Sequence, residues 1–217
     1  MKTLKIDWLI WIFLLTPFIF IGIYWNQFPN KIPTHFNFDG IPDDYSDKLQ
    51  GLLLLPGINL LMYFVFILLP IIDPSRKNYG LFQDKFKIIR IVLHLFLAFA
   101  FFLIAFYSLG YHFNMSFLII YSILLVFLII GNYLGNVRHN YFIGIRTPWT
   151  LSNEEVWKKT HRLAAKVWVI SSLLTMAVLP FVPANVAEFI FIGYIALITT
   201  IPIVYSYIVF SEIKKGE

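Results

Sequence analysis

The residues most capable of chemistry lie in two polar stretches of a chain that is otherwise strongly apolar. In the first stretch, residues 31–48, His35 is followed by Asp39 and Asp43. An imidazole and two carboxylates can bind a metal ion, but their spacing matches neither an HxxxH zinc motif nor a calcium-binding EF-hand. The alternative is a turn-rich loop that satisfies its own backbone groups and packs on the rest of the protein. We therefore predict no metal and no other cofactor.

The second polar stretch, residues 131–166, is basic. Its candidate recognition residues are Arg146, Trp149 and Arg162, because a guanidinium group binds phosphate or carboxylate through two parallel hydrogen bonds. Such a surface would recognise a protein partner or a lipid phosphate. The alternative is that these residues belong to a segment that lies in the lipid headgroup region without binding anything specific.

Local signals within this stretch predict a turn followed by a helix. Thr147 is expected to be extended, since Pro148 keeps the preceding residue out of the α region. Ser152 and Glu155 have the spacing of a capping box, which predicts a helix that begins near Asn153. Its less polar face would consist of Val156, Trp157, Thr160, Leu163, Ala164 and Val167. The other face would carry Lys158, Lys159, His161 and Arg162, which is typical of an amphipathic helix in the membrane interface.

The rest of the chain lacks the polar residues needed to cover a water-facing surface. Of its 217 residues, 59% are hydrophobic and only 13% are charged, whereas soluble domains contain about 25% charged residues. Crossing a bilayer takes about 20 helical residues. Six apolar runs approach or exceed that length: residues 8–25, 52–72, 88–109, 116–134, 167–181 and 186–210. The first run begins like a signal peptide, but its length, bulky end and missing cleavage site favour a retained helix.

Lysine and arginine are distributed very unequally between the segments that connect these runs. With the N-terminus inside the cell, 15 of the 17 lie on inner segments, and only Lys31 and Lys48 lie outside. The positive-inside rule therefore predicts that both termini are cytoplasmic, with loop 26–51 outside and loop 135–166 inside. The net charge of +5 is then a topology signal, and no direct nucleic-acid partner is expected. The predicted fold is all-α: one polytopic membrane domain of six transmembrane helices, with the amphipathic helix before the fifth span.

The predicted spans themselves contain little chemistry. Asn59, His94 and Asn132 are their notable polar residues, and no charged side chain is expected deep in any span. Because ionisable residues at depth mark ion pathways, this weakens an ion-coupled transporter, and His94 is expected to be a packing residue. The chain has no cysteine, and it has no Gly-rich phosphate loop, nucleophile elbow or HExxH motif, so an enzyme is not predicted.

Both polar stretches contain strings that are typical of a known family. The string GNYLGNVRHNYFIGIRTPWTLSNEEVWKKTHRLAAK resembles the signature of the Sdp immunity (SdpI) family of bacterial membrane proteins. The string IPTHFNFDGIPDDYSDK is similar to a domain of unknown function that commonly precedes that signature. The outer motif residues are Pro33, His35, Asn37, Asp39, Gly40 and Asp43. The inner motif residues are Asn132, Asn140, Gly144, Arg146, Thr147, Pro148, Trp149, Trp157, Thr160, His161 and Arg162.

This resemblance implies a multi-pass protein of the bacterial plasma membrane that gives immunity to a secreted antimicrobial peptide toxin. It also implies signalling, in which the toxin-occupied protein holds a transcriptional repressor at the membrane. The outer motif would then face the toxin, and the inner motif would face the repressor or membrane lipids. Two alternatives remain at this point: a small permease, and a protein that maintains the envelope by acting on lipids.

Overall fold

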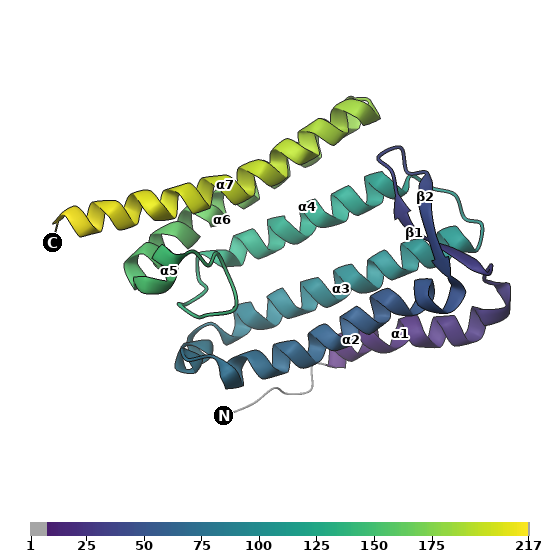
Figure 1. Ribbon diagram of the computed structural model, residues 1–217, viewed down its shortest axis with the longest axis horizontal. Coiled ribbons are helices and arrows are strands. Elements are labelled where there is room, and N and C mark those ends of the chain that lie inside the picture. The colour runs from purple at the N-terminus through teal and green to yellow at the C-terminus, as the bar shows by residue number, and fades with distance from the viewer. Residues whose placement is uncertain (1–7, 217) are drawn as a thin grey trace. The chain divides into compact units, whose positions relative to one another are not determined.

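The computed structural model describes residues 8–216 and consists mainly of helices (Figure 1). In chain order the elements are α1 (Trp8–Tyr24), η1 (Trp25–Gln27), β1 (Lys31–Phe36), β2 (Pro42–Asp47), α2 (Lys48–Ile72), η2 (Arg76–Leu81), α3 (Gln83–Ser108), α4 (Met115–Leu134), α5 (Pro148–Ser152), α6 (Glu154–Val178), η3 (Leu179–Phe181) and α7 (Ala184–Gly216). Within the described residues, six helical segments are long and apolar enough to cross a membrane: α1 with η1, α2, α3, α4, α6 with η3, and α7. The prediction of an all-α, multi-pass membrane protein is therefore confirmed.

These helices expose large apolar side chains along much of their length. Phe189 on α7 is 73% exposed, and Leu61 on α2 and Leu174 on α6 are 63% and 61% exposed. In water, exposure of this kind over several helices would cost free energy, whereas lipid tails cover it in a bilayer. The surface of the helices thus agrees with the apolar composition of the sequence.

A two-stranded antiparallel hairpin, β1–β2, occupies the part of the chain for which only turns were predicted. Lys31 pairs with Asp47 and Ile32 pairs with Ser46, and the register then shifts on both sides of His35. Proline and aspartate are depleted in strands, so the sequence of this segment gave no strand signal. The pairing depends on the partner strand rather than on local preference.

The amphipathic segment and the fifth predicted span form one continuous helix, α6, which corrects the prediction of a separate interfacial helix. The short helix that does precede it is α5, and it begins at Pro148. Asn153 caps α6, since its Oδ1 accepts hydrogen bonds from the N–H groups of Glu155 and Val156 at 2.8 and 3.1 Å. The predicted capping box at Ser152 is therefore wrong, because the cap lies one residue later.

The described residues divide into two compact units, and the first comprises residues 8–66 and 90–122. Its core contains Ile21, Phe28, Ile32, Leu52, Phe101 and Ala105. Here β1 packs directly against the start of α2, because a Cβ atom added to Gly51 would lie 2.6 Å from the Cβ of Ile32. Glycine at this position allows the hairpin to approach the helix closely.

A buried polar pair joins α2 and α3 within this first unit. His94 Nδ1 lies 2.6 Å from Asn59 Oδ1, and Asn59 Nδ2 donates to the His94 carbonyl at 3.2 Å. His94 is 0% exposed, as expected of a packing residue. Arg90, near the start of the predicted span 88–109, is buried in α3, with its guanidinium 5.8 Å from the ring centroid of Tyr63.

The second unit comprises residues 67–89 and 123–216. In this unit α6 packs against α7 (Figure 1). These two helices form a hairpin with a short turn at Pro183. Polar side chains join them at two levels. Trp168 Nε1 donates to the Ile198 carbonyl at 2.9 Å, and the hydroxyls of Ser172 and Tyr194 lie 2.9 Å apart.

Candidate recognition sites in the hairpin and the 135–147 loop

The tip of the hairpin is closed by the side chain of Asn37. Its Oδ1 accepts from the Ile41 N–H, and its own N–H donates to the Ile41 carbonyl, both at 2.9 Å. Gly40 has a φ of +78°, which is why glycine suits this position. Ser116, at the start of α4, donates to the Asn37 carbonyl at 2.7 Å. The tip therefore satisfies its own backbone groups and packs on its unit.

His35 and Asp43, whose side chains could bind a metal ion by their type alone, form a pair across the two strands. His35 Nδ1 lies 2.5 Å from Asp43 Oδ1, and both side chains are largely exposed. Asp39 is exposed at the tip, and within residues 8–216 no three His, Asp or Glu side chains are grouped closely enough to hold a metal ion. At the open end of the hairpin, Lys31 Nζ donates a 2.7 Å hydrogen bond to Asp47 Oδ1. This hydrogen bond, together with the positive charge of Lys31, lowers the pKa of the Asp47 carboxyl. The hairpin thus presents carboxylates on its exposed surface, while Pro33 is buried beneath it.

Asn140 organises the 135–147 loop from within. It is 0% exposed, and its Nδ2 donates to the carbonyls of Arg138 and Ile143, both at 2.9 Å. Its Oδ1 accepts from the N–H groups of Phe142 and Ile143 at 2.9 and 2.6 Å. One side chain therefore satisfies four backbone groups, which is how a buried loop avoids unpaired polar atoms. This predicted site residue acts on the loop itself.

Asp73, which the sequence analysis missed, holds the same loop from the end of α2. It is 2% exposed, and its Oδ2 accepts from the Tyr141 N–H and the Tyr79 hydroxyl, both at 3.0 Å. Its Oδ1 accepts from the Ser75 N–H at 2.6 Å. Burial, and then the hydrogen bond to Asp73, raises the pKa of Tyr79. An aspartate directly before Pro74 at the end of an apolar run was the only local signal for this role.

His161 anchors the loop to α6 and is buried, which corrects its predicted place on the polar face. Its Nδ1 lies 2.8 Å from the Trp157 carbonyl, and its Nε2 lies 3.0 Å from the backbone nitrogen of Ile145. A carbonyl only accepts and an N–H only donates, so the ring is the neutral tautomer with its proton on Nδ1. Gly144, with a φ of +119°, passes so close that a Cβ there would collide with His161 Nε2.

A capping box does form at the start of α5, between Thr147 and Thr150. It begins five residues before the box that was predicted at Ser152. The Thr147 hydroxyl accepts from the Thr150 N–H at 3.1 Å, and the Thr150 hydroxyl accepts from the Thr147 N–H at 2.9 Å. Thr147 is extended before Pro148, as predicted. Its hydroxyl also lies 3.0 Å from the Ser206 hydroxyl on α7. The end of the loop is thereby fixed to α7 as well as to α5.

The three predicted recognition residues lie in different surroundings. Arg146 is exposed and donates from Nη1 to the Tyr141 carbonyl at 3.2 Å. Trp149 is half-buried, with its ring centroid 5.1 Å from that of Tyr207 on α7. Arg162 is exposed on α6 and lines a separate cavity. The three residues thus have different neighbours, and a common recognition surface stays a prediction.

Two further residues of the predicted inner motif, Trp157 and Thr160, are buried inside the protein. Trp157 is 2% exposed and donates from Nε1 to the Val137 carbonyl at 2.9 Å. Thr160 is 0% exposed, and its hydroxyl has no hydrogen-bond partner among residues 8–216. Asn132 is exposed on α4, outside this network. Trp157, like His161, therefore holds the loop on α6.

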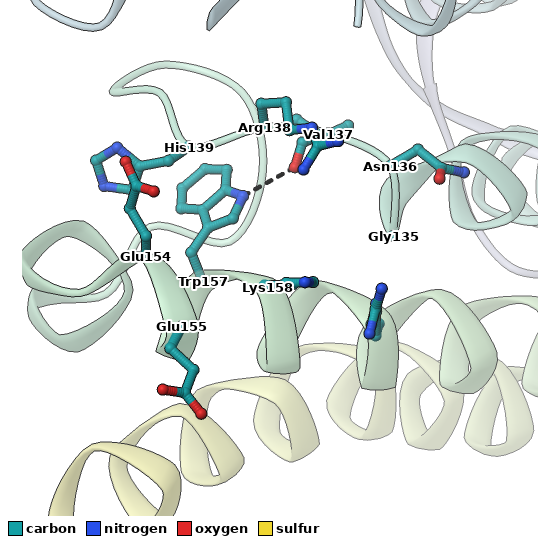
Figure 2. A pocket seen from close by; sticks show the side chains of 10 residues that line it. Gly135, Asn136, Val137, Arg138, His139, Glu154, Glu155, Trp157 and Lys158 are labelled. Carbon is teal, nitrogen blue, oxygen red and sulfur yellow. Dashed lines mark hydrogen bonds between the residues drawn. The ribbon is translucent and has the colours of Figure 1, made fainter. Parts of the chain in front are cut away.

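A cavity of about 390 Å³ lies between residues 135–139 and the first turns of α6 (Figure 2). Its α6 side is formed by Glu154, Glu155, Trp157, Lys158 and Arg162. Figure 2 shows the Trp157 ring in the middle, with its hydrogen bond to the Val137 carbonyl. Of these lining residues, only Trp157 and Arg162 belong to the predicted inner motif, because the cavity exists only where the loop folds back over the helix.

Comparison with known proteins identifies two regions that contain these sites. Residues 136–206 match the SdpI/YfhL protein family, and residues 12–60 match a domain of unknown function, DUF1648. The chain is 29% identical over 195 residues to "Immunity protein SdpI" of Bacillus subtilis (strain 168), which covers 90% of this chain and 91% of that protein. No solved structure matches the chain. The resemblance inferred from the two polar stretches is thus confirmed, and the chain carries an SdpI/YfhL family region at residues 136–206 behind a DUF1648 region.

Proposed function

We propose that this chain is a bacterial plasma-membrane protein that gives immunity to a secreted antimicrobial peptide toxin. The observation that carries the proposal is the similarity to an immunity protein over 90% of the chain. The two family regions take in both the hairpin and the 135–147 loop. The same similarity suggests binding rather than catalysis as the role of these sites.

The proposed topology puts the hairpin outside the cell and the 135–147 loop inside. It follows from the positive-inside rule, because 15 of the 17 Lys and Arg residues then lie on the cytoplasmic side. An even number of membrane helices returns the chain to the side on which it started, and six such helices are found in residues 8–216. This arrangement gives the protein one exposed site on each side of the membrane.

The hairpin is the proposed contact for the toxin. Asp39, Asp43 and Asp44 are exposed carboxylates, and Phe38 and Ile41 beside them are 39% and 59% exposed. Carboxylates next to apolar side chains suit a peptide that carries both basic and apolar groups. Because the hairpin packs on its own unit, it would offer this surface without folding on binding.

The 135–147 loop and α5 are the proposed contact for a cytoplasmic transcriptional repressor. Arg146, which is exposed, and Trp149, which is half-buried, are the members of the inner motif proposed to make this contact, while Asn140, Thr147 and His161 hold the backbone beneath them. Arginine and tryptophan side chains that reach the surface from a fixed backbone are typical of protein-binding surfaces. In this proposal, the toxin-occupied protein keeps the repressor at the membrane.

A protection assay tests the immunity function and both sites. The full chain is produced in a sensitive bacterium that lacks its own immunity protein, and survival is measured against the peptide toxin of the family's founding system. We expect wild type to protect and Asp43→Asn to protect poorly. Glu188→Gln, a charge removal on α7 outside both sites, is the matched control and should protect fully. If membrane-inserted wild type gives no protection, the proposed function is wrong.

The same cells test the inner site when they carry a fluorescent repressor. Arg146→Ala should leave the repressor in the cytoplasm after toxin is added, whereas Arg76→Ala, an exposed arginine on η2, should not. If Arg146→Ala and Trp149→Ala both keep full protection and normal repressor localisation, the inner-site role is refuted while immunity stands. Passage of labelled toxin across vesicles that contain the protein would favour a permease instead.

A further inference from the structure

The cavity between residues 135–139 and α6 is open to the surface and is lined by an excess of positive charge. Arg138, Lys158 and Arg162 line it, together with two carboxylates of the first turn of α6. One carboxylate is already neutralised, because Glu155 Oε1 forms a 2.7 Å ion pair with Lys159. Figure 2 shows that Glu155 points away from the loop side of the cavity. Three cationic groups thus face one uncompensated carboxylate, that of Glu154.

Neither guanidinium in the cavity has a partner within the described residues. The side chains of Arg138 and Arg162 form no hydrogen bond or ion pair with any group in residues 8–216, and both residues are exposed at the rim. Arg146, by contrast, is tied to the Tyr141 carbonyl. A guanidinium presents several N–H groups in a fixed plane, which match the oxygens of a phosphate.

The N-terminus of α6 is not itself the anion site. Asn153 already accepts hydrogen bonds from the first free N–H groups of the helix, those of Glu155 and Val156. Arg162 lies two turns further along α6 and faces residues 135–139, since the nearest atoms to a Cβ at Gly135 include the Cα of Arg162, 3.7 Å away. The charge is therefore concentrated along the side of the helix, next to the loop.

We propose that this cavity binds a phosphate group through Arg138, Lys158 and Arg162. The phosphate would belong either to the headgroup of an anionic lipid or to a soluble phosphate compound. Basic pockets beside membrane helices, on the side where Lys and Arg accumulate, attract anionic headgroups, and α6 continues from this cavity into a membrane span. The ligand would sit against Trp157 and the loop backbone, so its binding would stabilise the loop. This inference rests on the second unit alone and holds whether or not the chain gives immunity.

Calorimetric titration of the full chain, purified in a neutral detergent, tests the proposal with three probes. The probes are dihexanoyl phosphatidylglycerol, dihexanoyl phosphatidylcholine and inorganic phosphate. We expect saturable binding of the anionic lipid with one site per chain, and binding of the phosphatidylcholine at least about 10-fold weaker. Arg138→Gln and Arg162→Gln should each weaken binding by about 10-fold or more, because each removes a charge-assisted hydrogen bond. Arg76→Gln removes an exposed arginine of the same unit that does not line the cavity, and it should not change binding.

The titration with inorganic phosphate distinguishes a lipid headgroup from a soluble phosphate compound as the ligand. Binding of inorganic phosphate with the same response to the two arginine variants would support a soluble ligand, and lipid binding alone would support a headgroup. If an arginine variant does not fold, Lys158→Gln, at an exposed position on α6, replaces it. The proposal is overturned if neither phosphatidylglycerol nor inorganic phosphate binds, if the cavity variants bind as wild type does, or if Arg76→Gln weakens binding equally. The proposal is also overturned if the protein binds an acidic peptide but binds neither phosphatidylglycerol nor inorganic phosphate.

Discussion

Replacing Asp73 by asparagine should weaken the hydrogen-bonded contact between the end of α2 and the 135–147 loop. The buried carboxylate accepts three hydrogen bonds, from Ser75, Tyr79 and Tyr141. Asparagine has nearly the same shape but only one acceptor oxygen. Whichever way the new side chain is turned, its NH2 group faces a backbone N–H, either that of Ser75 or that of Tyr141. At least one buried donor therefore loses its acceptor.

The size of the effect on local opening follows from the loss of one hydrogen bond to a charged group. Such a bond contributes about 1.5–3 kcal/mol to stability. The remaining bonds also weaken, since their acceptor is no longer charged. Local opening of the loop should therefore become about 10- to 150-fold more frequent. The rest of the loop remains held by Asn140 and His161, so we expect local opening rather than global unfolding.

Hydrogen–deuterium exchange measured by mass spectrometry reports this opening directly. Peptides that cover residues 73–79 and 139–143 should exchange about 10- to 150-fold faster in Asp73→Asn than in wild type. Asp84→Asn is the matched control, because it removes an exposed carboxylate from the first turn of α3 and should leave both peptides unchanged. If exchange in the two peptides is the same in Asp73→Asn as in wild type, Asp73 does not hold the loop and the reasoning fails.

Two further substitutions test contacts that only the folded chain forms. Gly144→Ala should destabilise the second unit by about 1–3 kcal/mol, because φ is +119° and the new Cβ would collide with His161 Nε2; faster exchange at residues 143–147 would show it, and unchanged exchange would contradict it. Asn59→Leu should lower thermal stability in detergent by about 0.5–2 kcal/mol, since the hydrogen bond to buried His94 joins α2 to α3. A melting temperature equal to that of wild type would show that this pair contributes nothing to stability.

Parts of the site could be predicted from the sequence because their causes are local. Thr147 is extended because proline follows it, and the hairpin tip contains the Asn37 and Gly40 turn residues at which the chain reverses. The capping prediction failed because Ser152 and Asn153 are both good caps, and the choice between them depends on how α5 ends. The assignment of His161 to a polar face failed because imidazole is as often buried as exposed.

The sequence by itself was enough to predict that this chain enters a membrane and how many helices it uses, and it also predicts which side its loops favour. Apolar length and the placement of Lys and Arg are properties of consecutive residues, and lipid and membrane topology respond to them directly. Only the tertiary structure decided that Asp73 meets Tyr141, 68 residues away, and that His161 lies beneath Gly144. The same holds for the cavity at Arg138 and Arg162. These contacts depend on which distant segments pack together, and no local pattern of residues carries that information.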